Sequence, residues 1–417
     1  MPPLKIALLS RWYWEENRRH GETGGGMVRQ LAEAVAALGH EVVVLSQSPQ
    51  ATPLEKTQIG PLEVWLSPRD RKRDLLTGLR DKLAKQTYGH RKVHTDALAL
   101  RDFLARRGPF DVLWAQAEEP DGLVAALAAR RGLPLPPVLT QIQALRYRFV
   151  EARPVFDEKP ALGLAFRHAT RILANSQLVA DCLHHYACPD LSADQLLAKV
   201  RVVHPCLQRQ FLQAAEEIAS APVPASDRVL FFGALNEGKG ALVFLDALPQ
   251  TEAAKRGATF TVIGDFTEKN PAFARGWNES VAALRQTLAP AQLELLGKVT
   301  PFEVIRQIKL ARVVVIPSLF DAFSRALVET LILGVPVVTT DQVGAWPVVK
   351  EHDCGLVVPA GDAAALAHAI DLALSPHATY TENARHVGHR LLHEFSPDAI
   401  ARQLAHHLAE IAAPAQK

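Results

Sequence analysis

Short runs of β-branched and other apolar residues alternate along the chain with longer segments of helical periodicity. Such alternation predicts parallel β-sheets built from strand–helix units. In the first half of the chain we expect strands at residues 5–9, 41–46, 111–115, 137–142, 171–174 and 200–203. In the second half we expect them at 229–232, 259–263, 293–296, 312–316, 335–339 and 356–358. The predicted fold class is therefore α/β, with doubly wound, Rossmann-like sheets.

The alternation is interrupted once, beyond residue 205, where a helical segment leads into the Pro/Ala-rich stretch 221–226. A chain of 417 residues is also too long for one compact core. The sequence predicts a first domain over 1–205 and a second over 206–394. Ligands of such folds bind at the carboxyl ends of strands, so a shared ligand is expected in a cleft between the domains.

A helix is expected between the first two strands. Met27, Leu31, Val35 and Leu38 recur at helical spacing and predict one buried face. Gly39 follows where a helix-terminating glycine is expected.

Composition describes an ordinary globular protein, with 48% hydrophobic and 22% charged residues. A net charge of +2 gives no basic excess of the kind that nucleic-acid binding requires. The cysteines, at 182, 188, 206 and 354, match no zinc spacing, and we expect buried free thiols in a reducing cytoplasm. The short apolar run near the N-terminus is too brief for a signal peptide, so we expect the mature protein to start there.

The segment VLFFGALNEGKGAL, residues 229–242, superficially matches a Walker A phosphate loop. That loop needs a Ser or Thr after its lysine as a Mg²⁺ ligand, and here Gly240 follows Lys239. No strand supplies a suitable Walker B carboxylate either. We therefore expect Lys239 to meet a phosphate without the chemistry of a P-loop NTPase.

The segment PSLFDAFSRALVETLILGVPVVTT, residues 317–340, places Asp321 just before an expected helix and Glu329 in the second turn of that helix. Ser324 is expected to cap the helix, and the backbone N–H groups of Phe323, Ser324 and Arg325 form a site for a diphosphate. Carboxylates beside a phosphate site indicate recognition of sugar or ribose hydroxyl groups.

These motifs resemble the retaining glycosyltransferases of the GT-B fold, of the family-4 type. The resemblance lies in Asp321-x7-Glu329, in LGVPVVTTDQVG (333–344) and in DCGLVVPAGD (353–362). It continues in LGHEVVVL (38–45), ATRILANS (169–176) and FSPDAIARQLAHHL (395–408). The resemblance implies two Rossmann-like domains that face each other across a cleft, with the C-terminal segment 395–417 returning to the first domain.

The resemblance also implies roles for individual residues. Glu329 would hold the ribose hydroxyls, Asp321 a hydroxyl of the transferred sugar, and Lys239 the donor diphosphate. Where the family has an arginine beside this lysine the chain has Ala234, and Arg325 is a candidate substitute. The expected catalytic residues are Lys239, Asp321 and Gln116. The expected donor-binding residues are Gly24, Gly25, Gly26, Lys239, Val299, Phe323, Ser324, Arg325 and Glu329.

Gln116 stands at the end of the strand 111–115, where the family often has a histidine, and Glu118 and Glu119 follow it. Two interpretations remain open: an amide that hydrogen-bonds a sugar or acceptor hydroxyl, and a buried strand-end amide without a catalytic part. The glycines of GETGGGM (21–27) open a helix and would let the backbone approach a phosphate, the alternative being a plain flexible loop.

Residues 69–92 hold nine Lys or Arg against three Asp, and Leu75, Leu76, Leu79 and Leu83 gather on one helical face. A basic amphipathic helix of this kind binds anionic membranes, but a solvated face over an ordinary buried leucine stripe is the alternative. The expected localisation is cytoplasmic, with peripheral contact with the inner face of the membrane left open.

The sequence thus predicts a metal-independent, retaining hexosyltransferase that moves a sugar from a nucleotide-diphosphate sugar to an acceptor hydroxyl. Neither a cofactor nor a metal site is expected, and no nucleic-acid partner. Two alternatives remain: a catalytically degenerate protein that binds a nucleotide sugar without turnover, and a sugar-nucleotide epimerase on a similar fold. Donor hydrolysis would separate the first alternative from an active enzyme.

Overall fold

The structure is a computed structural model of the 417-residue chain. It describes residues 2–11, 13, 25–48, 51, 54–68, 79–80, 82–83, 85, 93–116, 121–143, 145, 147–150, 153–156, 160–185, 191–218, 227–266, 270–375 and 379–413. The chain divides into two compact units. Unit 1 comprises Met1–Arg146, Phe156–Arg209 and Phe395–Lys417, and unit 2 comprises Tyr147–Val155 and Gln210–Glu394.

Unit 1 is built on a sheet with the strand order β10-β9-β6-β5-β1-β2-β4-β3, which is parallel except for β3. Its strands are β1 (Lys5–Leu9), β2 (Glu41–Ser48), β3 (Glu55–Ile59), β4 (Leu62–Pro68), β5 (Val112–Gln116), β6 (Val138–Ile142), β9 (Arg171–Ala174) and β10 (Val200–Val202). Its helices are α2 (Gly25–Ala37), α4 (Val93–Arg107), α5 (Asp121–Arg130), α6 (Pro160–His168), α7 (Gln177–Cys182), the 3₁₀ turn η1 (Leu183–His185), α8 (Ala193–Ala198) and α18 (Pro397–Ala412).

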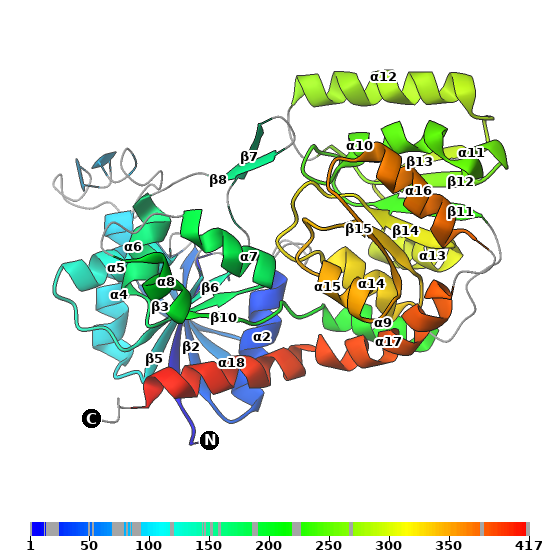
Figure 1. Ribbon diagram of the computed structural model, residues 1–417. Helices are drawn as coiled ribbons and strands as arrows, with labels where there is room; N and C mark the ends of the chain where they lie inside the picture. The colour runs from blue at the N-terminus through cyan, green and yellow to red at the C-terminus, as the bar shows by residue number, and fades with distance from the viewer. Residues whose placement is uncertain are drawn as a thin grey trace. The chain divides into compact units, whose positions relative to one another are not determined.

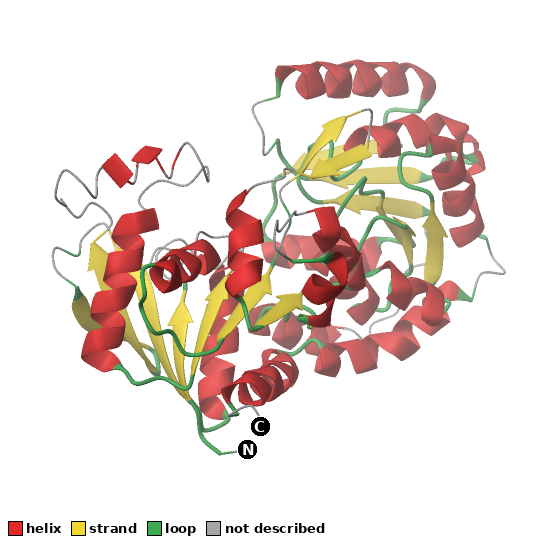
Figure 2. Ribbon diagram, turned by 60° about the vertical axis from the view of Figure 1, so that its left-hand side comes forward, coloured by secondary structure: helices red, strands yellow, loops and turns green. Residues whose placement is uncertain are grey.

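Helices cover both faces of this sheet because its central strands are apolar on both sides (Figure 2). Ile6 and Leu8 of β1 share a core with α2 and α18, whereas Ala7 and Leu9 share the other core with α4 and α5. Successive residues of a strand point to opposite faces, so an uninterrupted apolar run requires a layer on each side.

The C-terminal helix α18 lies against α2 in unit 1 (Figure 1). Ser396 caps it by accepting a hydrogen bond from the N–H of Ala399, and Pro397 occupies its first turn, where no N–H is needed. Leu404 and Leu408, four residues apart, lie on its buried face.

Unit 2 carries a parallel sheet with the order β13-β12-β11-β14-β15-β16. Its strands are β11 (Arg228–Phe232), β12 (Thr259–Ile263), β13 (Leu293–Gly297), β14 (Val313–Ile316), β15 (Val337–Thr340) and β16 (Gly355–Val358). Its helices are α10 (Ala241–Ala247), the 3₁₀ turn η2 (Leu248–Gln250), α11 (Glu252–Lys255), α12 (Pro271–Thr287), α13 (Pro301–Leu310), α14 (Arg325–Ile332), α15 (Trp346–Glu351), α16 (Ala363–Ala373) and α17 (Tyr380–Glu394). Helix α9 (Arg209–Ile218) begins at the boundary of the two units, and β7 (Tyr147–Val150) pairs with β8 (Arg153–Phe156) in a separate small sheet.

The strand order reverses direction at one point in each large sheet. In unit 1 the chain runs from β1 outward to β2 and then returns to β5 on the other side of β1. In unit 2 it runs from β11 to β12 and β13, and returns to β14 beside β11. Ligands of such folds bind at the carboxyl ends of the strands, at the switch point.

All strands expected from the sequence are present, with ends that differ by at most a few residues. The pairs β3–β4 and β7–β8 were not expected, because charged residues interrupt their apolar pattern, such as Glu55 and Lys56 in β3, Glu63 in β4 and Arg148 in β7. The prediction that Leu38 is buried is wrong: the helix α2 ends at Ala37, and Leu38 is 41% exposed. Gly39 has a φ of +94°, as a glycine that terminates a helix requires.

Cys182, Cys206 and Cys354 are buried free thiols, and Cys188 lies outside the described residues. The linker 221–226 also lies outside them. No helix in the part of the chain that the structure describes is long and apolar enough to cross a membrane.

Candidate functional site

The loop that carries Lys239 follows β11 and is held in a fixed shape. The N–H of Lys239 donates to Asn236 Oδ1 at 2.9 Å, and the N–H of Gly240 donates to the Glu237 carbonyl at 2.9 Å. Gly240 has a φ of +68°, and a Cβ there would lie 1.8 Å from the carbonyl oxygen of Pro317. The second glycine of the GKG motif is therefore required because the loop after β11 crosses directly over the end of β14.

Asp321 lies in the loop that leaves β14, the neighbour of β11 at the switch point. Its N–H donates to the Gln342 carbonyl at 2.9 Å, and its own carbonyl accepts the N–H of Gly344 at 2.8 Å. The loops after β11 and β14 are joined directly, because the N–H of Leu319 donates to the Gly238 carbonyl at 2.9 Å. The backbone of Asp321 is thus fixed from two sides.

The ammonium of Lys239 and the carboxylate of Asp321 meet across this junction. The distance from Lys239 Nζ to Asp321 Oδ2 is 2.5 Å, although 82 residues separate them in the chain. The side chain of Lys239 is 37% exposed and that of Asp321 is 13% exposed. A cation and a carboxylate at the carboxyl edge of the sheet can together bind an anion and accept a hydrogen bond from a hydroxyl group.

The N-terminus of helix α14 follows Asp321 closely. Ser324 occupies the N-cap position with φ of 69° and ψ of 87°, and its side chain makes no capping hydrogen bond. The prediction that Ser324 caps the helix through its side chain is therefore wrong, because the left-handed backbone turns the residue out of the extended conformation of an ordinary cap. The N–H of Phe323 donates to Asp321 Oδ1 at 3.4 Å.

Glu329 lies in the second turn of α14, as expected, and is half-buried. Burial raises the pKa of its carboxyl above the usual range, and the positive charge of Arg325, one turn earlier, opposes that rise. Among the described residues, the Glu329 carboxylate accepts no hydrogen bond from a protein group, and Arg325 donates none from its guanidinium. Both side chains therefore keep their polar atoms for a ligand.

Ala234 and Val299 are both half-buried and follow the carboxyl ends of β11 and β13. They lie at the same edge of the sheet as Lys239, since all strands of this sheet are parallel. The structure thus brings the residues expected in the second domain to one edge of unit 2.

Gln116 ends β5 in unit 1, beside the switch point at β1, and is 3% exposed. Its amide Nε2 donates to Gln141 Oε1 at 3.4 Å, and its Oε1 accepts from Gln143 Nε2 at 3.3 Å. Trp114 Nε1 donates to the same Gln141 oxygen at 3.0 Å. Gln116 is thus one member of a buried row of amides at this sheet edge.

Gly25 and Gly26 begin α2, and Gly24 lies outside the described residues, as do Glu118 and Glu119. Of residues 69–92 the structure describes 79, 80, 82, 83 and 85, and Leu75 and Leu76 lie outside these. Leu79 and Leu83 are each 54% exposed, so within the described part these two leucines do not form a buried stripe.

Sequence reasoning missed a partly buried polar cluster at the carboxyl edge of unit 1. Arg11 donates through Nη2 to Asp96 Oδ2 at 3.1 Å and through Nε to Gln47 Oε1 at 2.8 Å. Gln47 Nε2 donates to Asp96 Oδ1 at 2.6 Å, and the N–H of Arg11 donates to Asp121 Oδ2 at 3.1 Å. These residues line a pocket of about 20 Å³, roughly the room for one water molecule. The signal available in the sequence was Arg11, a charged residue two positions after the end of the buried strand β1.

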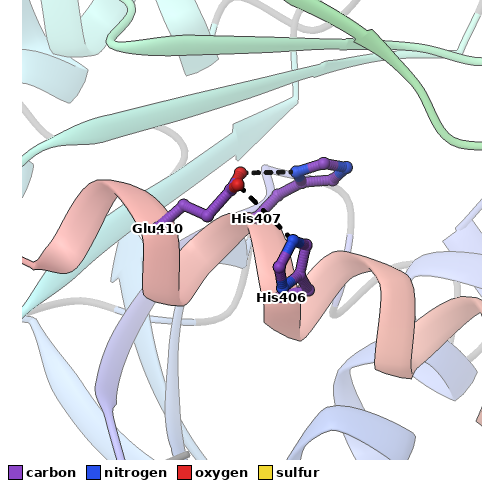
Figure 3. Close-up of side chains that lie close together, drawn as sticks. All are labelled: His406, His407 and Glu410. Carbon is purple, nitrogen blue, oxygen red and sulfur yellow. Dashed lines mark hydrogen bonds and ion pairs between the residues drawn. The ribbon is translucent and has the colours of Figure 1, made fainter.

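Within the described residues, His406, His407 and Glu410 on α18 form a group with the spacing of metal ligands, and both histidines are turned toward the glutamate (Figure 3). The guanidinium of Arg171 already contacts this group. Its Nη1 donates to Glu410 Oε2 at 2.8 Å and lies 3.4 Å from His407 Nδ1. A divalent ion bound here would have to displace the guanidinium. The group therefore stabilises the end of α18 against β9.

Two family models match the chain. Residues 24–191 match the model of the glycosyl transferase 4-like domain, and residues 226–375 match the model of glycosyl transferases group 1. The chain belongs to the group 1 glycosyltransferases.

Two known relatives and one solved structure are similar to the chain. The chain is 24% identical over 394 residues to a glycogen synthase of Mycobacterium tuberculosis, covering 91% of this chain and 89% of the relative. It is 30% identical over 161 residues to the phosphatidyl-myo-inositol mannosyltransferase of Mycobacterium leprae, covering 38% of this chain and 40% of that protein. The Anabaena protein HepE, solved with UDP and glucose, shares 17% identity with a TM-score of 0.64 over 98% of this chain and 100% of its own.

The predicted fold class is confirmed: this group 1 glycosyltransferase has two Rossmann-like units of the GT-B fold. Its reaction class is the transfer of a sugar from a nucleotide-sugar donor to an acceptor.

Proposed function

We propose that this glycosyltransferase is a metal-independent, retaining hexosyltransferase that uses a nucleotide-diphosphate sugar and a hydroxyl acceptor. The pairing of Lys239 with Asp321 at the switch point supports the proposal, because an ammonium that can bind a diphosphate lies beside a carboxylate that can accept hydrogen bonds from sugar hydroxyl groups. Lys239, with Arg325 and the α14 N-terminus, neutralises the diphosphate, and Glu329 binds the ribose hydroxyls. Phe323, Ser324, Val299 and Gly24–Gly26 complete the donor-binding set.

The chemical step needs little from the protein beyond charge and position. The bond between the anomeric carbon and the diphosphate oxygen breaks, and negative charge grows on that oxygen near Lys239. The acceptor oxygen bonds to the anomeric carbon on the face that the diphosphate leaves, so the configuration is retained. The acceptor proton passes to the departing phosphate oxygen, and Asp321 and Gln116 position sugar hydroxyls.

The purified protein should be screened against UDP-, GDP- and ADP-sugars, first by thermal shift and then by transfer and donor hydrolysis. We expect one nucleotide class to stabilise the protein and to be turned over, with the product anomer matching that of the donor by NMR. Binding without turnover would instead establish a degenerate binding protein, and an inverted anomer would contradict the retaining mechanism.

Activity should survive exhaustive treatment with EDTA. Lys239 and the N–H groups at residues 323–325 supply the positive potential for which metal-dependent transferases use a cation. The measurement is the initial rate of donor turnover before and after chelation. Complete loss of activity that Mn²⁺ or Mg²⁺ restores would show that the diphosphate site has been misassigned.

Affinity for the nucleoside diphosphate should depend on the ionisation of Glu329. Its carboxyl binds ribose hydroxyls best as a carboxylate, and its pKa is raised by burial. Affinity should therefore weaken as the pH falls through this raised pKa, above the usual value of about 4.3. Calorimetry with UDP, GDP or ADP between about pH 5 and 7.5 tests this. The phosphate of the ligand titrates as well, so the measured quantity is the difference from Glu329→Gln. Equal slopes for the two proteins would contradict the role.

We also propose peripheral contact of residues 69–92 with an anionic membrane. Leu79 and Leu83 are exposed one turn apart, and Arg80, Lys82 and Lys85 beside them are exposed too. The mannosyltransferase relative, whose name places its substrate on a phospholipid, supports a lipid-associated acceptor. Sedimentation should recover the protein with vesicles of anionic phospholipid and not with phosphatidylcholine vesicles. Leu79→Ser with Leu83→Ser should abolish this binding, and equal recovery with both vesicle types would count against the proposal.

A further inference from the structure

The carboxylate of Asp321 binds two groups that the proposed reaction assigns to the donor diphosphate. Its Oδ2 accepts from Lys239 Nζ at 2.5 Å, and its Oδ1 accepts from the N–H of Phe323 at 3.4 Å. Lys239 is the cation expected to bind the phosphate, and the N–H of Phe323 is one of the hydrogen-bond donors expected at the N-terminus of α14. The two carboxylate oxygens of Asp321 therefore accept hydrogen bonds from two of the groups that would otherwise donate to a phosphate.

The backbones on both sides of this contact are fixed. The N–H of Lys239 donates to Asn236 Oδ1, the N–H of Asp321 donates to the Gln342 carbonyl, and the bond from Leu319 to Gly238 joins the two loops. Movement of a loop would break these bonds. The contact between Lys239 and Asp321 can instead open by rotation of the long lysine side chain, which is more than a third exposed.

We propose that Asp321 is an internal competitor of the diphosphate for Lys239 and the Phe323 N–H, and that a hydroxyl of the sugar relieves this competition. This inference rests on the proposed function. A sugar hydroxyl that donates to Asp321 supplies the carboxylate with a new hydrogen-bond partner. Lys239 can then leave Asp321 and bind the phosphate with a smaller loss of free energy. The intact nucleotide sugar is thereby favoured over the bare diphosphate.

The same exchange assists release of the product. After transfer, the sugar no longer contacts Asp321, and the carboxylate again attracts Lys239. Binding of the nucleoside diphosphate then weakens. A largely buried carboxylate without a hydrogen-bond partner is unfavourable, so Asp321 competes again for Lys239. Asp321 thus acts on specificity and product release as well as on the position of the sugar.

The test is calorimetry of UDP, with ADP and GDP in parallel, on the full chain. Asp321→Asn should bind the preferred diphosphate about three- to tenfold more tightly than the wild type, because it removes a charge-assisted partner of Lys239. Glu237→Gln is the matched control, since it removes an exposed carboxylate two residues from Lys239 that makes no contact with its ammonium in the described residues. Its affinity should stay within about twofold of wild type.

The gain must also depend on Lys239. In a Lys239→Met background, the additional change Asp321→Asn should improve affinity by less than about twofold. Unchanged or weaker binding by Asp321→Asn, or an equal gain in the Lys239→Met background, would overturn the competition while leaving the transferase function in place. Failure of UDP, ADP and GDP alike to bind the wild type would overturn both.

Discussion

Replacing Lys239 with Ala should lower kcat by about 100- to 1,000-fold while the fold remains intact. Negative charge develops on the diphosphate as the sugar bond breaks, and an ammonium positioned at that oxygen stabilises the transition state more than the ground state. Lys239 is well placed for this role, because its loop is fixed at the switch point by Gly240 and Asn236. The measurement is the steady-state rate of donor turnover with saturating acceptor.

Two controls separate catalysis from stability in this experiment. Lys239→Ala leaves the Asp321 carboxylate without its ammonium partner, so Lys239→Gln is measured as well, because its amide can still donate to Asp321. Lys255→Ala removes an exposed lysine of the same unit that pairs with Glu252 and should retain full activity. Turnover within threefold of wild type for both Lys239 variants, with an unchanged melting temperature, would refute the assignment.

Replacing Arg325 with Ala should lower kcat/KM by about 100-fold, and adding Ala234→Arg should recover part of that loss. Arg325 is the first residue of α14 and carries a guanidinium that makes no hydrogen bond among the described residues. Ala234 follows β11, the strand adjacent to β14, and is half-buried at the same sheet edge. If the two positions serve the same phosphates, an arginine at one should compensate for its loss at the other.

A double-mutant cycle in kcat/KM measures this compensation. The coupling energy should exceed about 0.5 kcal/mol, and Ala234→Arg alone should gain little. Arg306→Ala, which removes an exposed arginine paired with Glu303, is the control for nonspecific loss of charge. Near-normal turnover of Arg325→Ala would leave Lys239 and the helix N-terminus as the groups that stabilise the leaving diphosphate. In that case the charge of Arg325 acts on Glu329 instead, as its effect on the pKa of that carboxyl indicates.

Local patterns in the sequence predicted every strand of the unit 2 sheet and all strands of the unit 1 sheet except β3 and β4. A run such as IALL (6–9) or VVVI (313–316) is apolar at every position, and only a strand covered on both faces buries all of its side chains. The rejection of a P-loop rested on Gly240 and on the missing Walker B carboxylate, and needed no coordinates. The Asp321-x7-Glu329 spacing likewise predicted where α14 begins and where Glu329 lies on it.

The sequence alone did not predict which segments far apart in the chain come into contact. Strand order is decided by packing of whole units, and it alone brings the loop after β11 beside the loop after β14, so that Lys239 meets Asp321. The same cause explains the cluster around Arg11, whose partners come from β2, α4 and the start of α5. The left-handed backbone at Ser324 also depends on tertiary contacts, since serine has no intrinsic preference for it. Periodicity and residue chemistry determined which elements form and which side chains are reactive. Contacts between segments far apart in the chain decided which of those side chains meet.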